Sequence, residues 1–375
     1  MNNNRCYAKI SIKNFLSNLD AITSVTSENC KIIPVIKADA YGHGAVQFAN
    51  AVKSRAFMFA VAEINEALQL RESGIEQKIL ILGYTDPQFA TILAKNNLVQ
   101  AVTDKGYAEK LSEYLEEDVL EIHLKVDTGM HRYGFDPLSD KSVDEIEAVS
   151  KLRSLKISGA FSHFSDSDVL TSDFTDIQLS RYLGFIDKLK SRGIDTGLLH
   201  IANSAATLTR PDAHLMAVRP GIILYGAYPS NEVKEKYLGE HPDRPLKEVM
   251  TMCARVGQVH TIKKGEPVGY NRTFTLDRDT TLATVTAGYA DGIPRSLSNK
   301  GEVMIGGERF KIVGRICMDL FMVDITDAKK PIHSGDEVIL WGENGISIDE
   351  YAEASGTISY TIYTGVSKRV IRIYE

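Results

Sequence analysis

The chain has 375 residues, 43% hydrophobic and 25% charged, which is typical of a soluble globular protein of two domains. Its net charge of −6 gives no reason to expect a nucleic acid or an anionic membrane as partner. The sequence has no membrane-length apolar run and no signal peptide, and its four cysteines are scattered, so we expect a cytoplasmic protein with free thiols and no metal site.

The first 226 residues alternate apolar, β-branched segments with helical patterns. Eight strands are predicted, at 32–37, 57–62, 79–84, 99–103, 122–126, 157–164, 198–202 and 217–225. Helices are predicted at 12–26, before the first strand, and then at 45–53, 64–73, 87–96, 105–115, 142–152 and 176–192. Such alternation indicates parallel βαβ units, and eight of them predict an α/β fold with a closed (β/α)8 TIM barrel.

The pattern changes after Tyr228. Residues 229–245 are polar and contain three prolines. Short strands with glycine turns follow, predicted at 254–262, 281–287, 302–305, 310–313, 322–325 and 337–340. We therefore expect a barrel over residues 1–240 and a mostly β domain over 241–375, whose sheet residues 1–11 could join.

Lys37 ends the first predicted barrel strand and precedes a glycine-flanked turn, Ala38–Gly44. An unpaired buried ammonium is costly, and desolvation lowers a lysine's pKa so that it can form a Schiff base. Chemistry in this barrel takes place at the carboxyl ends of the strands, where Lys37 stands. The lysine is therefore a candidate covalent anchor for a carbonyl cofactor.

The ends of the seventh and eighth strands are the usual phosphate site of this barrel. Here they carry Asn203–Ala206 and Arg219–Ile222, whose small residues let backbone N–H groups approach an anion. For the Asn203–Ser204 pair alone, a tight turn before a helix is an equally good interpretation. A lysine on strand one facing a phosphate cradle indicates a phosphorylated aldehyde, and pyridoxal phosphate is the obvious candidate.

The chain resembles fold-type III alanine racemases over nearly its whole length, a family that includes the racemase domain of vancomycin-resistance serine racemases. Six motifs in family order carry the resemblance, at residues 35–44, 125–132, 200–206, 219–226, 287–292 and 313–319. The resemblance implies an isomerase that interconverts L- and D-alanine through a pyridoxal phosphate aldimine, supplying D-amino acid for peptidoglycan. It also implies a homodimer with shared active sites, and serine is the alternative substrate.

The same resemblance implies roles for individual residues. Lys37 would hold the cofactor and act as one base, and Tyr289 would be the other. The phosphate would be bound by Tyr41, Ser204, Gly221, Ile222 and Tyr360. Arg219 would face the pyridine nitrogen, His163 would hold Arg219, and Arg132 would contact the cofactor's phenolic oxygen. Arg132 and the backbone N–H of Met318 would bind the substrate carboxylate.

Elementary chemistry supports these roles. Racemisation removes a proton from one face of the α-carbon and returns it on the other, so two bases on opposite faces are the simplest design. Arg219 stays charged and only donates hydrogen bonds, so it would leave the pyridine nitrogen unprotonated and favour reprotonation over transamination. For Tyr289, the alternative is a core tyrosine with a bonded hydroxyl.

Lys125 and Arg132 are two cations on one loop system and require an anion. Either Asp127 or a carbamylated Lys125, a modification seen in some members of the family, could provide it. The chain departs from the usual family pattern at Tyr133, Asn271 and Leu320, and at Ser359 and Thr361. These departures bear on whether the substrate is alanine or serine more than on the type of reaction.

Two other functional classes are weighed. A non-catalytic pyridoxal phosphate carrier would share only the barrel, and Tyr289 and Met318 in the second half argue against it. A fold-type III decarboxylase would place an acidic residue at the pyridine nitrogen, where this chain has Arg219.

Overall fold

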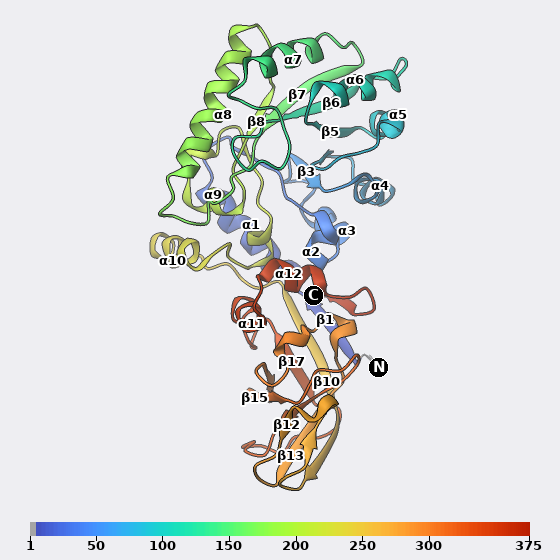
Figure 1. Ribbon diagram of the computed structural model, residues 1–375, viewed down its shortest axis with the longest axis vertical. Coiled ribbons are helices and arrows are strands. Elements are labelled where there is room, and N and C mark those ends of the chain that lie inside the picture. The colour runs from blue at the N-terminus through green and yellow to red at the C-terminus, as the bar shows by residue number, and fades with distance from the viewer. Residues whose placement is uncertain (1–4) are drawn as a thin grey trace.

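A parallel eight-stranded barrel and an antiparallel β domain lie at opposite ends of an elongated molecule (Figure 1). This computed structural model describes residues 5–375. The barrel strands follow the order β2-β9-β8-β7-β6-β5-β4-β3, and a parallel bridge between Val35 and Ala60 joins the two ends of the sheet. The predicted fold class is confirmed. The strands are β2 (Lys31–Ile32), β3 (Met58–Val61), β4 (Lys78–Ile81), β5 (Leu98–Val102), β6 (Leu120–Lys125), β7 (Leu155–Phe161), β8 (Leu198–His200) and β9 (Ala217–Val218).

Helices surround the barrel, and their starts are set by local capping. Ser11 accepts a hydrogen bond from Asn14 N–H at the start of the first helix, and Asp104 does the same for Tyr107 at the start of the sixth. All seven predicted helical regions form helices, although 87–96 is divided into two short ones. The bounds are α1 (Ile12–Val25), α3 (Ala45–Val52), α4 (Ile64–Glu72), η1 (Pro87–Phe89), α5 (Ala90–Lys95), α6 (Lys105–Glu113), α7 (Asp140–Ser150) and α8 (Phe174–Ser191).

Two predicted barrel strands are shorter than expected because a proline interrupts each. The strand predicted over 32–37 ends at Ile32, before Pro34, and Lys37 instead opens a short helical turn, α2 (Lys37–Gly42). The strand predicted over 217–225 ends at Val218, before Pro220, and the chain then forms a 3₁₀ helix, η3 (Ile222–Tyr225). Both interruptions lie at the carboxyl ends of strands, where they release the chain toward the site.

The β domain is one eight-stranded sheet in the order β13-β16-β15-β14-β17-β10-β1-β18. Its first strand in the sequence, β1, pairs antiparallel with β10 and parallel with β18, so the predicted N-terminal strand does join this sheet. Residues 1–4 of that prediction lie outside the described residues. The strands are β1 (Cys6–Ile10), β10 (Met250–Ile262), β13 (Thr280–Val285), β14 (Glu302–Ile305), β15 (Glu308–Val313), β16 (Phe321–Asp324), β17 (Glu337–Trp341) and β18 (Ile371–Tyr374).

Several elements were not predicted from sequence. The proline-containing polar stretch holds a helix, α10 (Asn231–Glu240), and the β domain carries a hairpin, β11 (Pro267–Val268) with β12 (Phe274–Thr275). Three further α-helices are α9 (Ser204–Thr209), α11 (Ile348–Ser355) and α12 (Ser359–Gly365). Helix α12 lies where the two domains meet (Figure 1), and this position brings Tyr360 to the barrel.

One continuous hydrophobic core runs through both domains. It includes Phe48 and Ile79 of the barrel, Val303 and Trp341 of the β domain, and Tyr363 of α12. The segment between α10 and β10 connects the two sheets, and we propose the domain boundary there, at 240/241. Among residues 5–375, no helix combines the length and apolar character that a membrane span needs.

Candidate active site

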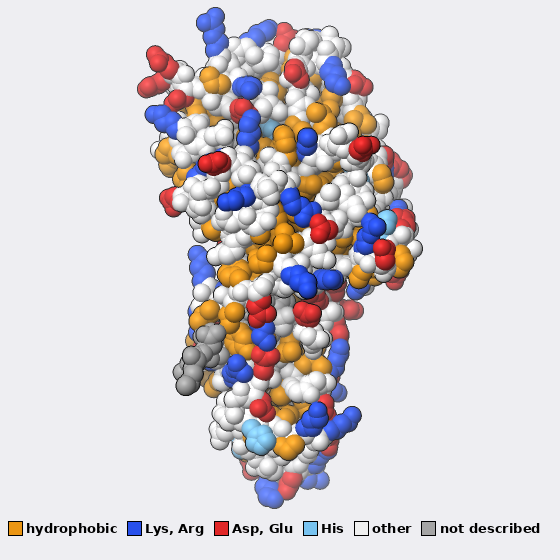
Figure 2. All heavy atoms as spheres, turned by 180° about the vertical axis from the view of Figure 1, so that it is seen from behind, with side chains coloured by type: hydrophobic (Ala, Val, Ile, Leu, Met, Phe, Trp, Pro, Cys, Tyr) orange, Lys and Arg blue, Asp and Glu red, His pale blue; other side chains and the backbone are white. Residues whose placement is uncertain are grey.

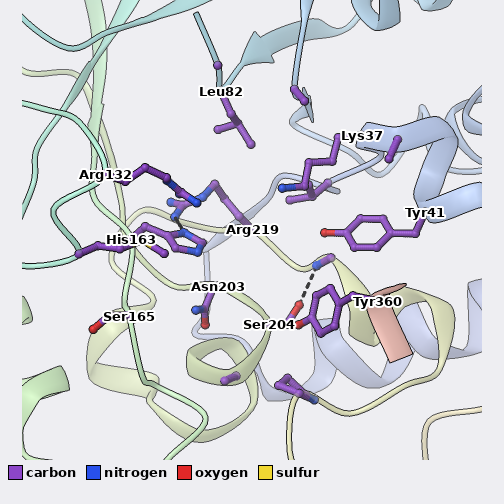
Figure 3. A pocket seen from close by; sticks show the side chains of 18 of the residues that line it. Lys37, Tyr41, Leu82, Arg132, His163, Ser165, Asn203, Ser204, Arg219 and Tyr360 are labelled. Atoms are coloured by element: carbon purple, nitrogen blue, oxygen red, sulfur yellow. Dashed lines mark hydrogen bonds between the residues drawn. The ribbon is translucent and has the colours of Figure 1, made fainter. Parts of the chain in front are cut away.

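A cavity of about 770 Å³ opens at the carboxyl ends of the barrel strands. Most of the residues predicted from sequence line it, and in Figure 3 their side chains converge from several strand ends. Ile222, Tyr289 and Met318 are not among the lining residues. The predicted residues that line it are Lys37, Tyr41, Arg132, His163, Ser204, Arg219, Gly221 and Tyr360.

Lys37 and Tyr41 enter the cavity from a left-handed turn. Residues Ala38–Tyr41 have φ between 51 and 54° and ψ between 40 and 50°, and none of them is glycine. A left-handed conformation costs an L-residue about 1–2 kcal/mol, so four in succession must be held by their surroundings. This turn brings both side chains to the same side of the cavity (Figure 3).

Lys37 is half-buried, and its environment disfavours the charged amine. Burial is the largest cause that lowers its pKa, and the cations of Arg132 and Arg219 lower it further, against the opposing charge of Glu66. A larger share of this lysine is therefore neutral than of an ordinary surface lysine. A neutral amine is the form that attacks a carbonyl group.

Arg219 is a buried cation that is surrounded by neutral acceptors. Its guanidinium donates to the carbonyls of Ser162 (2.7 Å) and Ile201 (3.0 Å). It also donates to Nδ1 of His200 at 2.7 Å and to Nδ1 of His163 at 3.3 Å. Burial lowers the pKa of Arg219 to about 10, so it remains charged near neutral pH. Among residues 5–375, no carboxylate forms an ion pair with it.

His200 is a site residue that sequence reasoning missed. It lies closer to Arg219 than His163 does, and it is fully buried at the end of β8. Because a guanidinium only donates, His200 accepts through Nδ1 and carries its proton on Nε2, which lies 3.0 Å from Nδ1 of His123. Burial and Arg219 hold the pKa of His200 well below its ordinary value. The available signal was its place in the predicted strand 198–202 and at the start of the motif 200–206.

Asp127 does not bridge Lys125 and Arg132, as the sequence suggested it could. Its carboxylate instead accepts hydrogen bonds from the backbone N–H groups of Gly129 (3.1 Å) and His131 (2.9 Å). These bonds shape the loop after β6. Lys125 is buried, with its ammonium 4.9 Å from the centre of the Phe161 ring. Burial and the nearby arginines hold the pKa of Lys125 well below its ordinary value.

A small polar cradle lies beside Lys37. Ser204 begins α9, and its Oγ accepts the N–H of Gly221 at 2.9 Å (Figure 3). A Cβ at position 221 would lie 2.6 Å from the Tyr41 hydroxyl, so only glycine leaves this space open. Tyr360 faces Tyr41 with ring centres 6.0 Å apart, and burial raises the pKa of both hydroxyls, which stay protonated as donors.

The predicted residues of the β domain lie on its surface. Tyr289 is 43% exposed and Met318 is 52% exposed, and the two loops are joined because Tyr289 N–H donates to Cys317 O and Ala290 N–H to Met318 O. Buried Asp291 anchors these loops by accepting from Arg5 and Arg369. These surface side chains are available to a second molecule.

Tyr270 is a second exposed tyrosine of the β domain, and sequence reasoning did not select it. It is 65% exposed and lines a surface hollow with Met318, and Tyr289 is not part of that hollow. Its turn is strained, since Asn271 and Arg272, neither of them glycine, both have positive φ. Strained backbone is concentrated at functional sites, which makes this tyrosine a candidate as well.

Comparison with known proteins agrees with this architecture. Profiles described as "Alanine racemase, N-terminal domain" and "Alanine racemase, C-terminal domain" match residues 10–229 and 249–374. The chain belongs to the alanine racemase family. The alanine racemase of Clostridium novyi is 42% identical and alanine racemase 1 of Clostridium acetobutylicum is 43% identical, each over 98% of this chain and 95% of the relative.

Solved alanine racemase structures are similar along the whole chain. The alanine racemase of Clostridium difficile 630 has a TM-score of 0.92 at 38% identity, covering 99% of this chain and 96% of that one. The Bacillus anthracis alanine racemase, solved with bound L-Ala-P, has a TM-score of 0.92 at 31% identity, covering 99% of this chain and 95% of that one. The resemblance drawn from the six sequence motifs is thereby confirmed.

Proposed function

We propose that this chain interconverts L- and D-alanine as a pyridoxal phosphate enzyme. The observation that carries the proposal is the pair of Lys37, with its lowered pKa, and Arg219, a buried cation held by neutral partners in the same cavity. The relatives reported above are named for alanine, which gives no support to the serine alternative.

The residues present fit this cofactor. Lys37 would hold the aldehyde carbon, and the space kept open by Gly221 would take the phosphate between Ser204, Tyr41 and Tyr360, with the backbone at Ile222 beside it. Arg219 would donate a hydrogen bond to the ring nitrogen, and His163 and His200 would orient its guanidinium. When bound, pyridoxal phosphate supplies the electron-withdrawing ring that makes the α-proton of an amino acid acidic.

The remaining residues would bind substrate and move a proton. Arg132 would contact the phenolic oxygen of the cofactor and pair with the substrate carboxylate, whose other oxygen the N–H of Met318 would bind. The neutral Lys37 amine would exchange the α-proton on one face, and a tyrosine would do so on the other. Arg219 would keep the ring nitrogen unprotonated, since it donates without giving up its proton, and this favours return of the proton over transamination.

The second base would come from a second copy of the chain. Tyr289 and Met318 do not line the cavity around Lys37, and both are exposed on the β domain. Three exposed large side chains, Tyr270, Met318 and Leu320, line one hollow there, and exposed Tyr289 lies on the loop that is hydrogen-bonded to Cys317 and Met318. An exposed apolar cluster of this kind is typical of an interaction site, and we propose a homodimer that completes each barrel cavity with the partner's β domain.

Lys125 is the site of a further proposal. The neutral amine that the lowered pKa favours could take up CO₂ and release a proton, and the resulting carbamate anion would satisfy Arg132, which Asp127 does not reach as an ion pair. Native mass spectrometry that showed only the unmodified amine would reject this. The four free cysteines are consistent with a cytoplasmic location, which we also propose.

A racemase assay tests the main proposal. Wild-type enzyme loaded with pyridoxal phosphate should interconvert the two enantiomers of alanine faster than those of serine, and Lys37→Ala should lose activity by several orders of magnitude because it removes the anchor and one base. Activity followed by chiral chromatography gives the measurement. Absence of turnover with either amino acid would end the proposal, and a faster rate with serine would reverse the substrate assignment.

Mixed dimers distinguish the two tyrosines. If Tyr289 is the second base, Tyr289→Phe should be nearly inactive, and mixing it with inactive Lys37→Ala should restore activity, because one site of each mixed dimer then has intact parts from both chains. Tyr270→Phe is the matched control with the same atom removed from the neighbouring tyrosine. If only Tyr270→Phe shows loss and restoration, the base is Tyr270. If neither Tyr→Phe variant loses activity and regains it in mixed dimers, the proposal that the partner supplies a catalytic tyrosine is refuted.

A further inference from the structure

The left-handed turn that carries Lys37 is held at each end by a different set of contacts. At its far end, His43 donates through Nδ1 to the carbonyls of Ala40 and Tyr41, both at 3.0 Å. The Asp39 side chain accepts the N–H of Ala45 at 2.8 Å and so joins the turn to α3. Arg372 of β18 donates to the carbonyl of Gly42 at 3.1 Å. None of these contacts acts on the residue next to Lys37.

Glu66 holds the near end of the turn. It lies in the first turn of α4, and its Oε1 accepts the N–H of Ala38, the first left-handed residue, at 2.5 Å. Its Oε2 accepts the N–H of Ala62, just beyond β3, at 2.7 Å. One carboxylate therefore joins the end of the first barrel strand to the end of the second. Both bonds are charge-assisted, which makes them stronger than bonds to a neutral acceptor.

We propose that Glu66 is a positioning residue for Lys37: its carboxylate fixes the N–H of Ala38 and thereby the direction in which the lysine side chain enters the cavity. This inference rests on the proposed function of Lys37 as the cofactor anchor. The geometry behind it is local, because a peptide unit has few soft torsions and Ala38 N–H belongs to the peptide bond that follows Lys37. The negative charge of Glu66 also opposes the effects of burial and Arg132 on the lysine.

Glu66→Gln tests the proposal, with Glu63→Gln as the matched control. Glutamine keeps the size of the side chain, but its one amide oxygen cannot replace two carboxylate oxygens, and its NH₂ would face a second donor. Glu63 lies three residues earlier, is exposed, and makes no side-chain capping bond. The control therefore makes the same change of charge at the start of the same helix, but it leaves the hydrogen bond between Glu66 and Ala38 intact.

Three measurements follow. In the cofactor-free proteins, hydrogen–deuterium exchange of residues 38–44 should be faster in Glu66→Gln than in wild type and unchanged in Glu63→Gln. Pyridoxal phosphate should bind Glu66→Gln about ten-fold more weakly, the effect of losing one strong hydrogen bond. The visible circular dichroism of bound cofactor should change while the far-ultraviolet spectrum does not, since the lysine would hold the ring at a different angle.

The outcomes separate this inference from the proposed function. Wild-type exchange and affinity in Glu66→Gln would overturn the positioning role, whatever the racemase assay shows. Should Glu66→Gln fail to fold, Glu66→Asp takes its place, because it keeps the charge but is too short to reach both N–H groups. Aspartate should also loosen residues 38–44 and weaken binding, and unchanged values there would overturn the role equally.

Discussion

Arg219 is stabilised by partners that carry no charge. His200, His163 and two carbonyls accept its N–H groups, and burial keeps both histidines neutral by lowering their pKa values. An acidic partner would neutralise the cation, whereas neutral acceptors orient it and leave its charge free to act in the cavity. His123 completes the arrangement, because its Nδ1 accepts the hydrogen bond that Nε2–H of His200 donates.

Substitution of His200 should reveal how much this orientation contributes. His200→Leu removes the acceptor of Arg219 and should weaken cofactor binding about ten-fold, the typical effect of losing a bond to a charged group. His200→Asn places an oxygen near the position of Nδ1 and should recover most of the affinity. Titration of the cofactor-free variants with pyridoxal phosphate checks both values. Equal weakening in the two variants would show that packing of the imidazole ring, rather than its acceptor, is what matters.

At the scale of elements, the site depends on interruptions of regular structure. Pro34 and Pro220 end the first and last barrel strands early, and the chain then turns into α2 and η3 at the cavity. The cradle between them has room because position 221 lacks a side chain.

Gly221→Ala should block the cradle. The added methyl group would lie 2.6 Å from the Tyr41 hydroxyl and 3.6 Å from Ser204 Oγ. We expect affinity for pyridoxal phosphate to fall by about ten-fold or more, since the methyl group displaces donors from the anion. Gly365→Ala in α12, where a new Cβ meets no atom within 4 Å, is the control and should bind normally. Normal binding by Gly221→Ala would place the phosphate elsewhere.

Periodicity predicted every barrel strand and the seven helical regions around them, because these elements bury regular apolar faces. It failed in the apolar run 217–225, where Pro220 ends the strand early. It also failed in the polar stretch 229–245, where α10 forms although three prolines indicated a loop. Motifs located Lys37, Arg219 and Ser204. They did not reveal His200 or Glu66, whose importance comes from contacts with backbone and side chains distant in sequence.

At the scale of the molecule, one face carries an apolar patch near the junction of the two domains (Figure 2). Figure 2 shows hydrophobic side chains gathered around the level where the barrel meets the β domain. Glu248 lies at this junction, where its carboxylate accepts the N–H of Ile348 at the start of α11. Burial raises the pKa of Glu248 to about 7. The junction therefore contains a group that titrates near neutral pH.

Glu248 should make stability depend on pH. A glutamate has an ordinary pKa near 4.3, so between about pH 4.3 and 7 the folded state binds more protons than the unfolded state, and the free energy of unfolding falls as pH rises. We expect wild type to lose about 2 kcal/mol relative to Glu248→Gln between pH 5 and 8, less than the full shift implies because the group is partly exposed. Urea unfolding of both proteins at the two pH values measures this difference. An equal change in the free energy of unfolding of the two proteins between the two pH values would contradict this prediction.

The position of β1 has a consequence for how the chain is made. This strand leaves the ribosome first, yet its two neighbours in the sheet are β10 (Met250–Ile262) and β18 (Ile371–Tyr374). The barrel that begins at α1 can assemble during synthesis, since all its strands precede residue 219. The β domain cannot close until translation is nearly over, and until then β1 remains an unpaired edge that is open to chaperones and to wrong partners.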